Sequence, residues 1–218
     1  DGVINITGGK IAVTTTGAGG EGIESKSTME ISGGEVVVNS SDDAINAASH
    51  LTVSGGMVYA RATNNDGIDA NGNCYIKGGL VYAVSASSPE VGIDANTEGG
   101  YKLYVHGGTI VSIGGLESGA SLSQSCYSTS SWSKNTWYAL TVGNNTFAFK
   151  TPSSGGSTLV VSGASTPTLK SGVTASGTAI FDGAGYYPAS VSGGSSVSLS
   201  SYSGGGGGPG GGPGGGRW

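Results

Sequence analysis

The hexapeptide Asp66-Gly67-Ile68-Asp69-Ala70-Asn71 decides the fold, because related hexapeptides stand on both sides of it. Each copy has an isoleucine at its third position and a polar side chain directly after it. The copies are Glu21-Gly22-Ile23-Glu24-Ser25-Lys26, Asp43-Ala44-Ile45-Asn46-Ala47-Ala48 and Val91-Gly92-Ile93-Asp94-Ala95-Asn96. Their isoleucines are 22, 23 and 25 residues apart, a spacing typical of stacked supersecondary units. The sequence therefore predicts a repeat architecture.

Each repeat also contains a Gly-Gly pair with apolar residues at fixed distances on both sides of it. The pairs stand at 8–9, 33–34, 55–56, 78–79 and 107–108. Apolar and polar residues alternate before and after each pair, which is the pattern of a strand with one buried face. Together with the hexapeptide strand, this gives three short strands in a repeat of about 22–25 residues. We expect each repeat to form one coil of a parallel β-helix, stabilised by its neighbours.

The repeats divide the chain into three parts. Residues 1–122 are expected to form the coils, 123–203 a C-terminal β extension or cap, and 204–218 a Gly/Pro-rich tail. An insertion at Thr97–Tyr101 in the fourth coil is expected to form a loop on one face, often a binding face. We expect the tail to dock on its own domain or on a neighbouring molecule.

The cap is predicted to be antiparallel. Strands at 137–142 and 146–150 flank a hairpin turn at Gly143-Asn144-Asn145. Further strands are expected at 158–161, 178–181 and 195–199, with a turn at Ser171-Gly172 between two of them.

Composition excludes several classes of protein. Glycine accounts for 44 of 218 residues, only 11% are charged, and no apolar run reaches the roughly 18 residues of a membrane span. Thirteen of the 14 acidic residues lie in 1–117, and arginine is nearly absent, so a nucleic-acid surface is not expected. The low Lys and Glu content is typical of an extracellular, cell-surface protein, and we expect a secreted chain from which an export signal has been removed.

The repeated acidic residues are candidate metal ligands. On a strand, a residue next to an inward isoleucine points outward, so Asp69 is expected on the surface in a ladder with its counterparts. Stacked carboxylates about 4.8 Å apart repel one another unless a cation lies between them. Ca²⁺ takes oxygen ligands from carboxylates, amides and carbonyls. The candidate ligands are Asp43, Asp66, Asp69, Asn71, Asp94 and Asn96. The alternative is that these residues only shape turns, a common role of Asp and Asn.

Two tyrosines are candidates for sugar contact. Tyr59 and Tyr82 occupy equivalent outward positions after the glycine corners, where an aromatic ladder could stack on sugar rings. The alternative is a ladder that supports the strands and is covered by the C-terminal part. Cys74 falls in the inward ladder with Leu51 and Leu103, so we expect it to be a core residue.

These motifs resemble a known family. The combination of Gly-Ile-Glu-Ser-Lys-Ser at 22–27, Ile-Ser-Gly-Gly-Glu-Val at 31–36, Asp-Gly-Ile-Asp-Ala-Asn-Gly at 66–72 and Ile-Lys-Gly-Gly-Leu-Val at 76–81 is similar to the carbohydrate-binding β-helix domain family of clostridial type. The resemblance covers about 2–122 and, through shorter segments, 146–176. It implies an all-β, right-handed, single-stranded parallel β-helix like that of pectate lyases, which is secreted, binds Ca²⁺ through the repeated Asp motif and binds acidic or neutral plant-type polysaccharide.

Three functions follow from these patterns. The first is an extracellular calcium-binding protein that binds polysaccharide at the cell surface. The second is a structural subunit that stacks on copies of itself, head to tail, into an extracellular filament. The third, a polysaccharide lyase, needs a basic residue beside the metal, usually with help from arginine, and Lys26, Lys77 and Lys102 have no Arg partner in the pattern. We therefore expect a protein that is not an enzyme.

Overall fold

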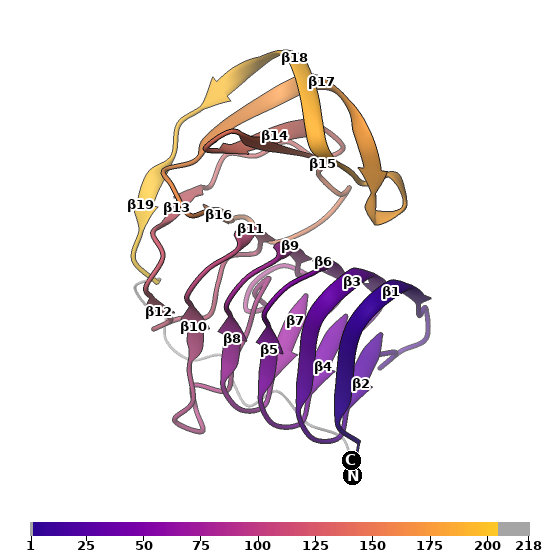
Figure 1. Ribbon diagram of the computed structural model, residues 1–218. Coiled ribbons are helices and arrows are strands. Elements are labelled where there is room, and N and C mark those ends of the chain that lie inside the picture. The colour runs from indigo at the N-terminus through magenta and orange to yellow at the C-terminus, as the bar shows by residue number, and fades with distance from the viewer. Residues whose placement is uncertain (1, 205–218) are drawn as a thin grey trace.

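The computed structural model describes residues 2–204, which form a parallel β-solenoid with a small antiparallel barrel packed along one side of it (Figure 1). The described part is all-β apart from η1, a single 3-10 turn at Phe181–Gly183. Its helical content includes nothing long and apolar enough to cross a membrane.

The solenoid has about four turns, and its strands form three parallel rows. The row before the glycine corner contains β1 (Ile4–Thr14), β3 (Met29–Ser40), β5 (Leu51–Val53), β8 (Cys74–Ile76), β10 (Leu103–Val105) and β12 (Ser121–Leu122). The row after the corner contains the second halves of β1 and β3, then β6 (Met57–Ala62), β9 (Leu80–Val84) and β11 (Thr109–Ile113). The third row contains β2 (Ile23–Ser25), β4 (Ile45–Ala47) and β7 (Ile68–Ala70). Three strands per coil are therefore confirmed.

The coils stack in phase, with like residues paired from one coil to the next. Ile23 pairs with Ile45 and Ile45 with Ile68, as the hexapeptide alignment predicts. Cys74 lies between Leu51 and Leu103 and is fully buried with a free thiol, which confirms its role as a core residue. These inward ladders form one continuous apolar core through the solenoid.

The hexapeptide glycine is required by close packing. A Cβ atom at Gly67 would lie 2.6 Å from the carbonyl oxygen of Gly92, 2.9 Å from the amide nitrogen of Val84 and 3.0 Å from the carbonyl oxygen of Ala60. All three atoms belong to the backbone, so they have little freedom to move aside.

The C-terminal part alternates between strands that extend the solenoid sheet and strands that form a closed barrel. After β11 the sheet continues antiparallel through β16 (Leu159–Ser162), β13 (Cys126–Thr129) and β19 (Ser200–Tyr202). The closed barrel contains β14 (Trp137–Val142), β15 (Asn145–Lys150), β18 (Gly185–Val197) and β17 (Thr168–Ile180).

The predicted hairpin at 137–150 is confirmed, but the predicted turn at Ser171-Gly172 is wrong. The 13-residue strand β17 runs through both residues, because β18 pairs with it along almost its whole length. The expected docking of the tail at 205–218 lies outside the described residues.

The barrel covers the outer face of β6, β9 and β11, and the C-terminal part as a whole contacts both ends of the solenoid. At the early coils, the backbone N–H of Phe181 donates to Glu35 (2.6 Å), and Lys10 bridges Glu35 (3.6 Å) and Asp182 (2.9 Å). At the last coil, β16 pairs with β11. A second apolar core fills the space between barrel and solenoid.

Substitution of Gly67 by Ala should destabilise the protein by about 1–3 kcal/mol, the usual cost of overpacking a dense site. Gly17→Ala is the matched control, because a Cβ atom there meets nothing within 4 Å. The measurement is the free energy of unfolding in urea. Equal values for the two variants would contradict the packing role of Gly67.

Candidate functional site

The third strand row carries a ladder of polar side chains on its outer face. Parallel pairing places Asn46 between Glu24 and Asp69. Two isolated parallel bridges, Ile68 to Ile93 and Ile93 to Leu116, extend the same row by two further coils. We call this set of residues the carboxylate ladder: Glu24, Asn46, Asp69, Asp94 and Glu117.

Two further acidic residues lie just before the ladder strands and are buried. Asp43 is 6% exposed and Asp66 is 7% exposed. Each accepts a hydrogen bond from a backbone N–H of the following coil, Asp43 from Asp66 (2.9 Å) and Asp66 from Val91. These carboxylates therefore link successive coils as well as carrying charge.

Burial and mutual repulsion raise the pKa values of these carboxyl groups. Burial raises the pKa of Asp43 to about 9, that of Asp66 to about 8 and that of Asp69 to about 6, and neighbouring carboxylates add to each shift. Burial, followed by a hydrogen bond to Glu117, raises the pKa of Asp94 well above its usual range. Without a nearby cation, the folded protein thus favours protonated Asp43, Asp66 and Asp94 at neutral pH.

One oxygen atom of the ladder lacks a partner. The Asn46 side chain is 7% exposed, and its Nδ2 donates to Glu21 (3.1 Å), while its Oδ1 is buried without a hydrogen bond. A buried oxygen without a donor is costly, and a cation would satisfy it. Among residues 2–204, however, no three His, Cys, Asp or Glu side chains converge into a complete metal site, so amide and backbone oxygens would have to share the coordination.

The predicted ligands differ in their surroundings. One acidic region contains Asp43, Asp66, Asp69 and Asp94. The charges of Asp66 and Asp69 raise the pKa of Asp43 and that of Asp94, and the charge of Asp69 also raises the pKa of Asp66. Asn71 is exposed. The Asn96 side chain is used by the insertion loop, because its Oδ1 accepts from the N–H of Gly99 (2.7 Å) and its Nδ2 donates to the carbonyl of Asn71 (3.2 Å).

Sequence reasoning missed Glu117 as a member of this region. Gly115-Leu116-Glu117 is a shortened copy of the motif, and its Gly115 stands 23 residues after Gly92. That spacing is the signal that identifies it.

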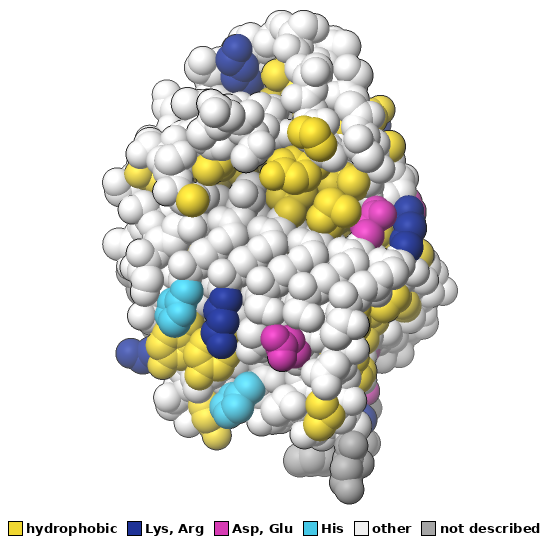
Figure 2. All heavy atoms as spheres, viewed as in Figure 1, with side chains coloured by type: hydrophobic (Ala, Val, Ile, Leu, Met, Phe, Trp, Pro, Cys, Tyr) yellow, Lys and Arg dark blue, Asp and Glu magenta, His cyan; other side chains and the backbone are white. Residues whose placement is uncertain are grey.

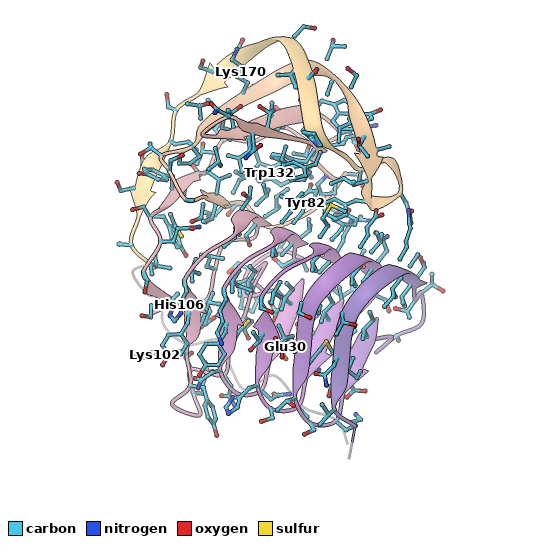
Figure 3. The ribbon with its side chains drawn as sticks, viewed as in Figure 1. Glu30, Tyr82, Lys102, His106, Trp132 and Lys170 are labelled. Carbon is cyan, nitrogen blue, oxygen red and sulfur yellow. The ribbon has the colours of Figure 1, made fainter. Side chains whose placement is uncertain are left out.

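Tyr59 and Tyr82 do not form an open sugar surface, which corrects that prediction. Tyr82 is fully buried and Tyr59 is 6% exposed, because the barrel covers the face on which they stand. The Tyr82 hydroxyl donates to the carbonyl of Lys150 in the barrel (3.0 Å), and the ring contacts Phe147 and Phe149. Figure 3 shows Tyr82 between the two parts of the molecule. The alternative of a covered, supporting ladder is correct.

An aromatic pair that the sequence did not single out lies on the first strand row. Tyr75 of β8 and Tyr104 of β10 are directly paired on the outer face, and both are partly exposed. The signal was present in the alternation, since each tyrosine stands between two inward residues of its strand.

Comparison with known proteins gives one match. A family model described as "Carbohydrate-binding domain-containing protein" matches residues 4–179. The chain belongs to this carbohydrate-binding domain-containing family. A search of curated proteins and a search of solved structures give no match.

Membership of the carbohydrate-binding domain-containing family supports a polysaccharide partner and a binding protein rather than an enzyme. It agrees with the carbohydrate-binding part of the resemblance seen in the sequence.

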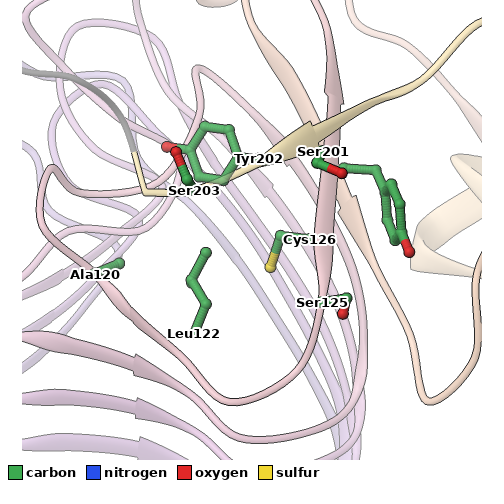
Figure 4. Close-up of a pocket in the computed structure, with 8 residues that line it drawn as sticks. Ala120, Leu122, Ser125, Cys126, Ser201, Tyr202 and Ser203 are labelled. Atoms are coloured by element: carbon green, nitrogen blue, oxygen red, sulfur yellow. The ribbon is translucent and has the colours of Figure 1, made fainter.

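A pocket of about 390 Å³ lies where β12, β13 and β19 meet in this family member (Figure 4). Its lining contains no charged side chain and consists of Ala120, Leu122, Ser125, Cys126, Tyr127, Ser201, Tyr202 and Ser203. None of the candidate metal or sugar residues faces it, so it is not part of the candidate site.

The raised pKa values predict how stability depends on pH in the presence of a chelator. The folded protein binds protons on Asp43, Asp66 and Asp69 more tightly than the unfolded chain does. This contribution is complete below the unfolded pKa near 3.8 and is lost as the pH rises through the folded values of about 6, about 8 and about 9. We therefore expect the free energy of unfolding to fall over this range.

The measurement is urea denaturation in a chelator from about pH 4 to about pH 9. Asp43→Asn keeps an oxygen for the Asp66 N–H and should flatten the pH profile. A free energy of unfolding that rises with pH in the parent protein would contradict the prediction.

Proposed function

We propose that this protein is secreted, binds polysaccharide at the cell surface and holds Ca²⁺ on its carboxylate ladder. The family supports the polysaccharide partner, and the low Lys and Glu content supports export. The solenoid is proposed to be a right-handed β-helix, the hand that parallel β crossovers adopt in nearly all proteins.

The observation that carries the calcium proposal is the set of buried and half-buried acids without basic partners. Among the described residues, ion pairs involve only Lys10 and Lys26, and of the ladder members only Glu24 has such a partner. The unpartnered Oδ1 of Asn46 adds a neutral oxygen to the same region. This mixture of carboxylate and amide oxygens is the donor set that Ca²⁺ prefers.

Asp43, Asp66, Asp69 and Asp94 would supply the charged oxygens, with Asn46 and Glu117 beside them. Asn71 and Asn96 are less well placed. Asn71 is exposed, and the Asn96 Oδ1 already accepts a hydrogen bond from the insertion loop. A bound cation neutralises the repulsion between coils and lets Asp43, Asp66 and Asp94 ionise at neutral pH. Calcium is thus proposed to stabilise the scaffold that presents the sugar-binding surface.

Calcium should raise the melting temperature of the parent protein at neutral pH. A ligand at 100 times its dissociation constant adds about 2.7 kcal/mol of stability to the folded state. The double variant Asp69→Asn/Asp94→Asn should lose most of this rise, since two charged ligands are replaced by neutral ones. Melting curves recorded with calcium and with chelator provide the measurement.

Glu98→Gln is the control for this experiment, because Glu98 is an exposed acid in the insertion loop. It should keep the full calcium response. An unchanged melting temperature of the parent protein on calcium addition would rule out the calcium part of the proposal.

The polysaccharide part is tested separately by co-sedimentation with a panel of insoluble polysaccharides, both neutral and acidic, in the presence of calcium. We expect the parent protein to move from the supernatant to the pellet with at least one of them. Absence from every pellet would refute polysaccharide binding.

A further inference from the structure

The outer face of β8 and β10 presents two parallel tyrosine rings to solvent. The ring centroids of Tyr75 and Tyr104 are 5.0 Å apart, and the ring planes differ by 12°. Both side chains are partly exposed, in contrast to the covered pair Tyr59 and Tyr82. The barrel packs on a different strand row, so it leaves this face open.

Hydrogen bonds hold Tyr75 and the backbone just before β10 in position. The Asn73 side chain donates from Nδ2 to the hydroxyl of Tyr75 (3.0 Å) and accepts at Oδ1 from the backbone N–H of Lys102 (2.9 Å). The backbone N–H of Asn73 in turn donates to Nδ1 of His50 (2.9 Å). The face is therefore ordered before any ligand arrives, which lowers the entropic cost of binding.

Basic side chains surround the pair. The Nζ atom of Lys77 lies 5.0 Å from the centroid of the Tyr75 ring, and His106 meets Tyr104 edge to face at 5.7 Å. Lys77, Lys102 and His106 are exposed, and neither lysine forms an ion pair within residues 2–204. Figure 3 shows Lys102 and His106 on the β10 side of the solenoid, and Figure 2 shows Lys, His and hydrophobic side chains gathered on this flank.

The insertion loop extends the face past the end of the strands. Tyr101 is 40% exposed, and its ring meets His50 edge to face at 5.8 Å. The loop that carries it is closed by hydrogen bonds from Gly99 to Asn96 and from Gly100 to Thr97. The loop thereby adds a third tyrosine to the same flank as Tyr75 and Tyr104.

The two ends of this strand row differ in charge. Pairing places Glu30 next to Thr52, and Thr52 next to Tyr75. An acid thus stands two coils before the tyrosines, whereas lysine and histidine flank the tyrosines themselves. An anionic chain is attracted to the β8–β10 end of the row and repelled from the β3 end.

We propose that Tyr75, Lys77, Tyr101, Lys102, Tyr104 and His106 form the polysaccharide-binding surface, and that it takes a polysaccharide with carboxylate groups. This proposal rests on the proposed polysaccharide binding and assigns it a place and a ligand class. The tyrosines offer apolar ring surface to the C–H faces of sugars and hydroxyls to their polar edges. The lysine ammonium groups pair with the carboxylates.

The test compares binding of the parent protein and its variants to polygalacturonate and to a neutral β-glucan. Tyr75→Ala/Tyr104→Ala should weaken polygalacturonate binding by at least about tenfold, a loss typical of aromatic side chains that a ligand covers. Tyr186→Ala, which removes a partly exposed tyrosine from the barrel, should leave the affinity unchanged. Melting curves of all variants check that each one folds.

A second variant avoids the aromatic residues. Lys77→Gln/Lys102→Gln changes only exposed side chains, and it should weaken polygalacturonate binding several-fold and reduce its dependence on salt. Neutral glucan should bind more weakly than polygalacturonate to the parent protein.

The outcomes separate this proposal from the function on which it rests. If the parent protein binds polygalacturonate and both double variants bind it within about twofold of the parent, the surface is wrongly assigned. If the parent prefers the neutral glucan, the ligand class is wrong. If the parent binds no polysaccharide at all, the proposed function itself fails, and the surface assignment fails with it.

Discussion

The structure depends on in-phase parallel pairing between successive coils. One coil has too little interior to bury its isoleucines and valines, and stacking makes their inward positions into a continuous core. The same pairing repeats every outward position as well. A polar residue beside the buried isoleucine becomes a carboxylate ladder, and a tyrosine beside a buried cysteine or leucine becomes a ring stack. Backbone register therefore produces both candidate binding features.

The three strand rows have different roles. One row lies under the barrel and gives its aromatic residues to a second core. Another carries the acids, and the third carries the tyrosines and lysines. Since these two rows lie on different faces of the solenoid, a cation on one and a polymer on the other would not compete for the same space. Both rows pack on the same inward core.

Local periodicity predicted the solenoid well, because the information is contained in each repeat. The position of Cys74 in the core and the in-phase pairing of Ile45 and Ile68 both follow from it. The outward direction of Tyr82 was also correct, but its cover is supplied by Phe147 and Phe149, far away in sequence. Gly172 was interpreted as a turn for a related reason: only its partner strand β18 shows that β17 continues. The alternation also predicts that Tyr75 and Tyr104 point outward, but that this face stays open follows only from where the barrel packs.

The C-terminal part contacts both ends of the solenoid, through Phe181 and Asp182 at the early coils and through β16 at the last one. These contacts therefore constrain the number of turns in the solenoid. Repeat proteins change length readily by gaining or losing a unit, yet an additional coil here would move β11 away from β16 or Glu35 away from Phe181. Evolution of a longer or shorter binding surface in this protein would then require a matched change in the barrel, so the architecture favours variation in side chains over variation in coil number.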